Sequence, residues 1–322
     1  MQYSWIMNFL SINSFGEIMR HFMTFCISFV CLLVFCSPLV AGDKPTVFVS
    51  ILPQKYFVEQ LAEDLVDVEV MVKPGASPAT YEPKVSQMRQ LASSAIYFSI
   101  GVPFERAWLE RIAGVNSHMR IARTDAGIEK IAMEKHLHDH DAEHSGHGDD
   151  EDEAYGGTGD DGLDPHIWLS PALVKEQAAT IAAALIELLP AESQKIDANL
   201  QSFYDRIEQL DVELKGILKD KTGMRFMVFH PSWGYFAQTY GIKQIPIEFE
   251  GKGPKSSQLK DLILFAREQD IHVIFAQPQF STKSAQLVAR EIKGQVITVD
   301  PLAENWLKNM KQVAEKFRDA IQ

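Results

Sequence analysis

The sequence predicts an α/β protein of two lobes, each a mostly parallel sheet flanked by helices, joined by one long rigid helix. Two observations support this fold class. Short β-branched runs alternate with helical patterns in both halves of the chain, which is the order that places parallel strands between covering helices. Between the halves, apolar residues recur at steps of three and four, as expected for one helix with a single apolar face.

The first lobe is predicted to span residues 43–190. Its predicted strands are 46–52, 66–72 and 95–100, and its predicted helices are 54–63, 84–93, 104–113 and 171–189. Pro171 opens the last of these helices. At that position the missing amide hydrogen of proline removes no helical hydrogen bond.

The connection between the lobes, residues 191–221, is predicted to form a helix over 192–219 that is about 40 Å long. Its apolar stripe consists of Ile196, Leu200, Phe203, Ile207, Leu210, Leu214 and Ile217. An ordinary surface helix lying on one lobe would have the same stripe. We favour a strut packed along both lobes, because the segment lies between two sets of strands and helices. Such a strut would keep the relative motion of the lobes small.

The second lobe is predicted to span residues 222–322. Its predicted strands are 224–229, 244–248, 273–276 and 295–299, with helices between them and a last helix over 303–321. The residues that directly follow these strands are of interest, because ligands of open α/β sheets bind beyond the carboxyl ends of the strands.

Residues 1–42 have the pattern of a cleavable secretory signal peptide. A short basic segment at Arg20 precedes an almost wholly apolar run over residues 22–35, and the small residues Ala41 and Gly42 follow. This run is too short for a membrane span and has the length of a signal core. We therefore expect a periplasmic protein.

All three cysteines lie in this predicted signal peptide, namely Cys26, Cys31 and Cys36. A lipid anchor at Cys36 would need a small residue before it, and Phe35 stands there instead. Soluble export is the better prediction. The mature protein would then contain no thiol, which leaves histidine, aspartate and glutamate as metal donors.

The composition excludes several classes of function. The formal net charge is −12, and no basic stripe suggests nucleic-acid binding. Past residue 42, no apolar run approaches the length needed to cross a bilayer. The glycine pattern contains no phosphate-binding loop and no nucleophile elbow, so nothing specifically supports an enzyme.

Residues 134–163 form a segment rich in histidine and acidic residues. Five of the ten histidines lie in it, namely His136, His138, His140, His144 and His147. A segment this polar cannot bury itself, so we expect a disordered, solvated loop. Mixed imidazole and carboxylate donors suit Zn(II) and its first-row neighbours. The simpler alternative is a charged run that only increases solubility.

Three polar residues stand where a metal site between the lobes would be built. His230 and Asp300 directly follow predicted strands, and His166 lies just before a predicted helix. Taken singly, a histidine after a strand is more often structural, and an Asp-Pro pair often caps a helix. In an exported chain without thiols, the three together favour one shared cation.

Several motifs resemble those of the zinc- and manganese-specific solute-binding proteins of ABC importers (the cluster A-I metal receptors). They are VSILPQKYF (49–57), KPGASP (73–78), TYEP (80–83), DPHIWLSP (164–171), HPSWGYF (230–236) and DPL (300–302). The resemblance covers essentially the whole mature chain. It implies two α/β lobes joined by one long helix, one metal buried in the cleft between them, and delivery to a membrane permease.

The resemblance also implies the ligands. His166 and His230 match the second and third metal histidines of the family, and Asp300 matches its carboxylate ligand. The first family histidine falls where this chain has Ala79, which cannot bind a metal. Water, Glu82 or a histidine of the acidic loop could take the open position, and we favour water, because Glu82 is expected to hold the turn after Pro83.

Taken together, these patterns predict high-affinity capture of Zn(II), with Mn(II) second, by a monomeric receptor of an ABC importer. The acidic loop favours zinc, since within the family it accompanies the zinc branch, and we expect it to collect or sense metal. Two alternatives stay open. The chain could be a periplasmic zinc buffer or adhesin in which the loop is the active element. It could also be an exported metalloenzyme with a site of two histidines and one carboxylate.

Overall fold

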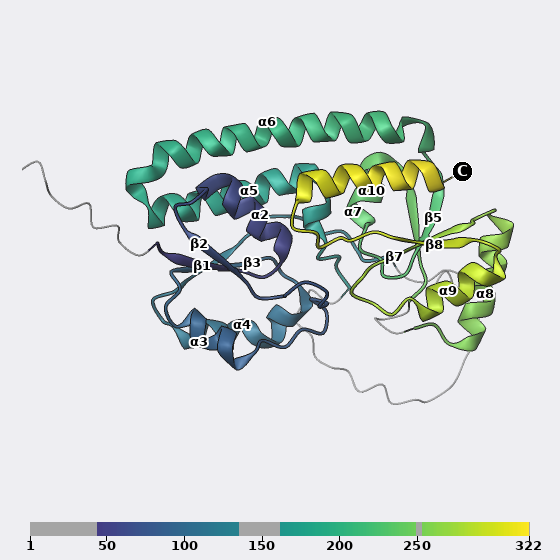
Figure 1. Cartoon of the computed structure of the whole chain (residues 1–322), viewed down its shortest axis with the longest axis horizontal. Helices are drawn as coiled ribbons and strands as arrows, with labels where there is room; N and C mark the ends of the chain where they lie inside the picture. Colours follow the sequence, from purple (N-terminus) through teal and green to yellow (C-terminus); the bar gives the residue numbers. More distant parts are fainter. Residues whose placement is uncertain (1–43, 135–161, 249–252, 322) are drawn as a thin grey trace, which may run out of the picture. The chain divides into compact units, whose positions relative to one another are not determined.

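The computed structural model describes residues 44–134, 162–248 and 253–321. Residues 44–322 form one compact unit, shown in Figure 1. The predicted signal peptide and the histidines of the acidic loop lie outside the described residues. Within the described ranges, no helix has the length and apolar character that a membrane span requires.

The first sheet contains four strands in the order β2-β1-β3-β4, and every pair is parallel. The strands are β1 (Thr46–Val49), β2 (Asp67–Val70), β3 (Ile96–Ser99) and β4 (Arg120–Arg123). The helices between them are α2 (Leu52–Ala62), α3 (Val85–Leu91) and α4 (Pro103–Val115). Strand β4 is absent from the sequence-based prediction. It is an edge strand with an exposed arginine at each end, and such charged edges lack the apolar run that marks a central strand.

The second sheet repeats this order as β6-β5-β7-β8, again with parallel pairs throughout. The strands are β5 (Arg225–Val228), β6 (Lys243–Pro246), β7 (Val273–Ala276) and β8 (Gln295–Thr298). The helices are α7 (Gly234–Tyr240), α8 (Ser256–Glu268), α9 (Lys283–Glu291) and α10 (Trp306–Ala320). Helix α10 begins three residues later than predicted, because the Asn305 side chain caps it by accepting a hydrogen bond from the Lys308 amide at 3.2 Å.

Two helices lie between the sheets in the sequence, α5 (Pro171–Leu188) and α6 (Ser193–Leu218). Helix α6 contains 26 residues, which corresponds to about 40 Å. It packs against α2 and α5 towards its N-terminal end and against α10 towards its C-terminal end (Figure 1). Its buried stripe ends at Leu218, whereas Leu200 and Ile217 of the predicted stripe are only partly buried. The predicted fold class and the helix packed along both halves are confirmed.

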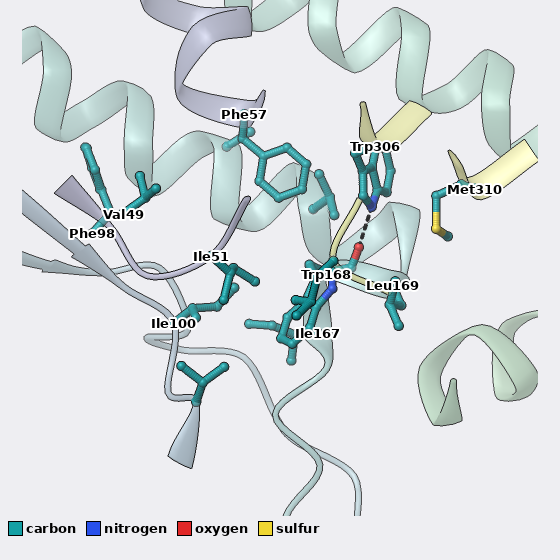
Figure 2. Packing of buried hydrophobic residues seen from close by; sticks show 14 of the residues in the cluster. Val49, Ile51, Phe57, Phe98, Ile100, Ile167, Trp168, Leu169, Trp306 and Met310 are labelled. Carbon is teal, nitrogen blue, oxygen red and sulfur yellow. Dashed lines mark hydrogen bonds between the residues drawn. The ribbon is translucent and has the colours of Figure 1, made fainter. Parts of the chain in front are cut away.

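Two tryptophans fasten the two halves to each other close to the candidate site. The Trp306 indole nitrogen donates to the Trp168 carbonyl at 2.7 Å, the bond dashed in Figure 2. The Trp168 indole nitrogen donates in turn to the Pro301 carbonyl at 2.7 Å. Phe57 packs edge-on against Trp306 with ring centroids 5.5 Å apart. The loop that contains His166 is therefore bonded directly to the loop that contains Asp300.

A buried carboxyl group holds the turn between β3 and α4. Glu105 accepts hydrogen bonds from the Ile100 amide at 3.1 Å and the Gly101 amide at 2.7 Å, and from the Ser50 hydroxyl. Burial raises the pKa of Glu105 to about 7. These bonds fix the backbone that leads into Val102, a residue of the cavity described next.

Candidate metal site

Polar side chains follow all four strands of the second sheet. His230 comes two residues after β5, Glu248 two residues after β6, Gln279 three residues after β7, and Asp300 two residues after β8. Because the strands are parallel, their carboxyl ends meet at one edge of the sheet, where ligands of this fold class bind.

A cavity of about 50 Å³ lies where this edge faces the first half of the chain. The polar side chains that line it are Ser77, His166, His230 and Gln279, and the other lining residues are apolar. One water molecule occupies about 30 Å³ in the liquid. The cavity therefore has room for an ion together with water.

The His166 imidazole is held from behind by Asp164. Its Nδ1 lies 2.6 Å from Asp164 Oδ1, which also accepts the His166 backbone amide at 2.9 Å. Asp164 is fully buried, and its carbonyl accepts the Tyr235 hydroxyl at 2.8 Å. Burial lowers the pKa of His166, against the opposing effect of Asp164. The imidazole is thus neutral at pH 7, which is the form that binds a metal.

Gly234, the first residue of α7, makes room for this aspartate. A β-carbon at position 234 would lie 2.6 Å from Asp164 Oδ2, closer than atoms of packed side chains approach. Any side chain there would displace Asp164 and, with it, the ring of His166.

The second imidazole, His230, has a matching arrangement. Its Nδ1 lies 2.5 Å from Glu248 Oε1, and Glu248 is buried. The Gln277 side chain forms two hydrogen bonds with the backbone of His230. It accepts from the His230 amide at 3.2 Å and donates to the His230 carbonyl at 2.6 Å. Phe280 stacks on the ring with centroids 4.8 Å apart. These contacts hold the ring of His230 in its orientation.

The two imidazoles lie together, with ring centroids 5.2 Å apart. An ionised carboxylate only accepts hydrogen bonds, so the Nδ1 atom of each ring carries the hydrogen and Nε2 keeps its lone pair. Carboxylates behind metal-binding histidines act in this way, fixing the tautomer and increasing the basicity of the ligand. The structure thus provides two imidazole donors next to one small cavity.

Asp300 does not line this cavity. It lines a neighbouring one of about 220 Å³, together with Gln279, which lines both. Asp300 Oδ1 accepts hydrogen bonds from Gln279 Nε2 at 2.7 Å and from the Leu302 amide at 2.9 Å. In the ranges that the structure describes, no three His, Cys, Asp or Glu side chains are grouped to hold a metal ion.

The remaining predicted residues divide into three cases. Ala79 does line the histidine cavity, as expected for the position of the missing family histidine. Glu82 is exposed and does not belong to the cavity lining. The five loop histidines lie outside the described residues. Next to these residues, the Met133 amide donates to the Gly162 carbonyl at 2.7 Å, and Met133 lines the cavity.

Comparison with known families agrees with this geometry. Residues 47–320 match the family described as ZnuA, the periplasmic component A of a zinc-uptake complex. The chain belongs to the ZnuA family. The resemblance inferred from the sequence motifs is therefore confirmed, and the family consists of receptors for zinc uptake through ABC importers.

Three similar proteins illustrate the match. The high-affinity zinc uptake system protein ZnuA of Yersinia pestis is 28% identical over 266 residues, covering 80% of this chain and 82% of the relative. A crystal structure of ZnuA is 41% identical, with a TM-score of 0.76, and covers 86% of this chain and 99% of its own. A ZnuA deletion mutant solved with zinc bound is also 41% identical, with a TM-score of 0.75, and covers 86% and 98%.

Sequence reasoning missed three residues around this ZnuA-family site, namely Asp164, Glu248 and Gln279. Asp164 stands in the quoted DPHIWLSP motif, but no role is predicted for it. Glu248 and Gln279 follow β6 and β7 in the same way that His230 and Asp300 follow β5 and β8. In sheets of this class, ligands bind beyond the carboxyl ends of the strands. A search for any polar residue just after each predicted strand would have found Glu248 and Gln279.

The carboxylate behind His230 should contribute to zinc affinity without touching the metal. We expect Glu248→Ala to weaken zinc binding about 10–100-fold, the usual effect of removing such a partner. Glu248→Gln should weaken it less, because the amide oxygen can still accept from Nδ1. Competition titration against a zinc chelator measures both.

A matched control for this prediction is Asp270→Asn, which alters an exposed His–Asp pair formed with His272 at 3.0 Å. It should leave zinc affinity unchanged. Equal affinities for the parent, Glu248→Gln and Glu248→Ala would show that Glu248 does not support the site.

Proposed function

We propose that this chain captures one Zn(II) ion outside the cytoplasm at His166 and His230, with Asp300 as a supporting carboxylate next to the same site, and delivers it to the permease of an ABC importer. The observation that carries this proposal is the pair of imidazoles, of which His166 is buried and His230 partly buried. Their ring centroids are 5.2 Å apart, and each ring has a carboxylate on Nδ1. A site of this kind is prepared for a cation before the cation arrives.

The donor chemistry favours zinc. Neutral imidazole is a borderline ligand that suits Zn(II), whereas Mn(II) prefers oxygen donors. Zn(II) is bound tetrahedrally by nitrogen and oxygen ligands at about 2.0–2.2 Å, which a cavity of about 50 Å³ accommodates. The zinc-bound ZnuA deletion mutant supports the same ion for this chain.

Reversible capture is consistent with an incomplete set of protein ligands. Sites with fewer than four protein ligands keep a position open for water or an exchanging group. In this chain Ala79 lines the cavity without offering a donor, so we propose that water occupies that position. A site that holds its ion with fewer protein bonds releases it more readily, as handover to a permease requires.

Export by a signal peptide over residues 1–42, a periplasmic location and a monomeric state belong to this proposal. The extracytoplasmic location is supported by the family, whose members are periplasmic zinc-uptake components. The permease partner is supported by relatives described as parts of zinc uptake systems.

The proposal is tested by zinc titration of residues 44–322 in competition with a chelator. We expect one tight zinc equivalent at pH 7, also in a variant that lacks residues 135–161. Affinity should fall with acidification, because protons compete for the imidazoles. Because burial lowers the pKa of His166, protons should compete with zinc for this ring only below the usual histidine pKa of about 6.5.

Absence of a tight equivalent, or its disappearance when residues 135–161 are removed, would contradict the proposal. The second outcome would favour a zinc buffer that uses the histidine-rich segment. Cells that lack their own zinc receptor provide the matching functional measurement, since the exported chain should restore growth when zinc is scarce.

A further inference from the structure

The two histidines leave the coordination of a zinc ion incomplete, and Asp300 does not reach their cavity. We propose that the amide oxygen of Gln279 is the third protein ligand, and that Asp300 acts from behind this amide and does not bind the metal itself. This inference rests on the proposed function and assigns to the same site a ligand that the sequence does not predict.

Gln279 has the right position and an unused acceptor. It lines both the histidine cavity and the neighbouring cavity that contains Asp300. Its Nε2 donates to Asp300 Oδ1 at 2.7 Å, which turns the other end of the amide away from Asp300. Its Oε1 is buried and has no hydrogen-bond partner among the described residues. A buried acceptor without a partner is costly, and a bound cation or its water would satisfy it.

The pairing of Gln279 with Asp300 repeats the pairing seen at both histidines. Asp164 holds His166 and Glu248 holds His230, each through one carboxylate oxygen. In each pair a neutral donor lines the cavity while a carboxylate stands behind it. By accepting from the amide nitrogen of Gln279, Asp300 increases the negative charge on the amide oxygen Oε1. Asp164 and Glu248 have the same effect on the free ring nitrogens of the two histidines.

The other polar residue of the cavity lining is a weaker candidate. Ser77 presents a hydroxyl that already accepts the Ala79 amide at 3.3 Å, and a neutral hydroxyl is a poorer donor to zinc than a polarised amide. An amide oxygen is also a harder ligand than imidazole. Gln279 should therefore make the site more tolerant of Mn(II) than a site with a third histidine.

The test compares Gln279→Leu with Asp300→Asn. If Gln279 binds the metal, Gln279→Leu should weaken zinc binding about 10–100-fold and change the visible spectrum of the Co(II)-substituted protein, which reports the ligand set. Asp300→Asn should weaken binding less, because the asparagine oxygen can still accept from Gln279 Nε2. Gln279→Glu retains an oxygen at the same reach but cannot donate to Asp300, so it should weaken zinc binding less than Gln279→Leu does.

Gln286→Leu serves as a matched control, since the exposed Gln286 side chain lies on helix α9 and donates to Thr282, the residue that precedes this helix. Thermal unfolding without metal shows whether each variant folds. A parent-like affinity and Co(II) spectrum in Gln279→Leu, a larger loss in Asp300→Asn than in Gln279→Leu, or an equal loss in Gln279→Glu and Gln279→Leu would overturn the inference.

Failure of the proposed function gives a different result. In that case the parent protein has no tight zinc equivalent, or keeps one after both His166 and His230 are replaced. Gln279 can therefore fail as a ligand while capture of zinc by the histidine pair stands.

Discussion

Replacing His166 and His230 together with alanine should lower zinc affinity about 10⁴-fold. Structural zinc sites contribute about 10–16 kcal/mol over four ligands, which is roughly 3 kcal/mol for each ligand. Loss of two ligands then amounts to about 6 kcal/mol, and each 1.4 kcal/mol is a factor of ten. The effect should be this large because the two rings are neighbours in one cavity, with centroids 5.2 Å apart.

The measurement is a chelator competition with the parent, both single variants and the double variant. Each single variant should lose about 100-fold, since roughly 3 kcal/mol is removed. His118→Ala is the matched control, because His118 is exposed and outside the cavity. Retention of one tight equivalent in the double variant would show that zinc is bound elsewhere, and the histidine-rich segment would then be the first place to test.

The elements that the sequence predicts well are those whose pattern is local. Strand β7 matches its prediction at both ends, and α6 matches within one residue, because a buried strand and an apolar stripe are readable within a single segment. Strand β4 is missed because its own composition does not mark it as a strand. It is a strand because it pairs with β3. The start of α10 depends on a cap at Asn305, which shifts the boundary without altering the helix.

The sequence predicts those site residues that stand in a recognisable local motif, and it does not predict their partners from other strands. His166 and His230 stand in distinctive motifs, and the structure does bring them together. The position of Asp300 relative to them depends on Gln279, which lies 21 residues away in the sequence and is adjacent only because β7 and β8 pair in the sheet. Likewise, Glu248 reaches His230 across the pairing of β5 with β6. A single sequence does not specify such contacts between neighbouring strands.

Restoring the family histidine should change zinc affinity in the opposite direction. Ala79 lines the histidine cavity, and its side chain offers no donor. We expect Ala79→His to increase zinc affinity about 10–100-fold. One added ligand should contribute roughly 3 kcal/mol at most to the binding free energy. Ordering the new side chain in a cavity of about 50 Å³ costs entropy and so reduces this contribution. Thr80→His places the same imidazole one residue further along, outside the cavity lining, and should leave affinity unchanged.

The same variant separates capture from delivery. Affinity differences among closely related complexes lie mostly in the dissociation rate, so a site strengthened by a third imidazole should release zinc more slowly. Ala79→His is therefore expected to bind zinc more tightly in titration and yet to support slower uptake through the permease when zinc is plentiful. Dissociation measured by transfer to a fluorescent chelator, beside uptake of radioactive zinc, gives both quantities. If the variant bound more tightly and also released and delivered zinc as fast as the parent, the alanine at position 79 would have no bearing on release.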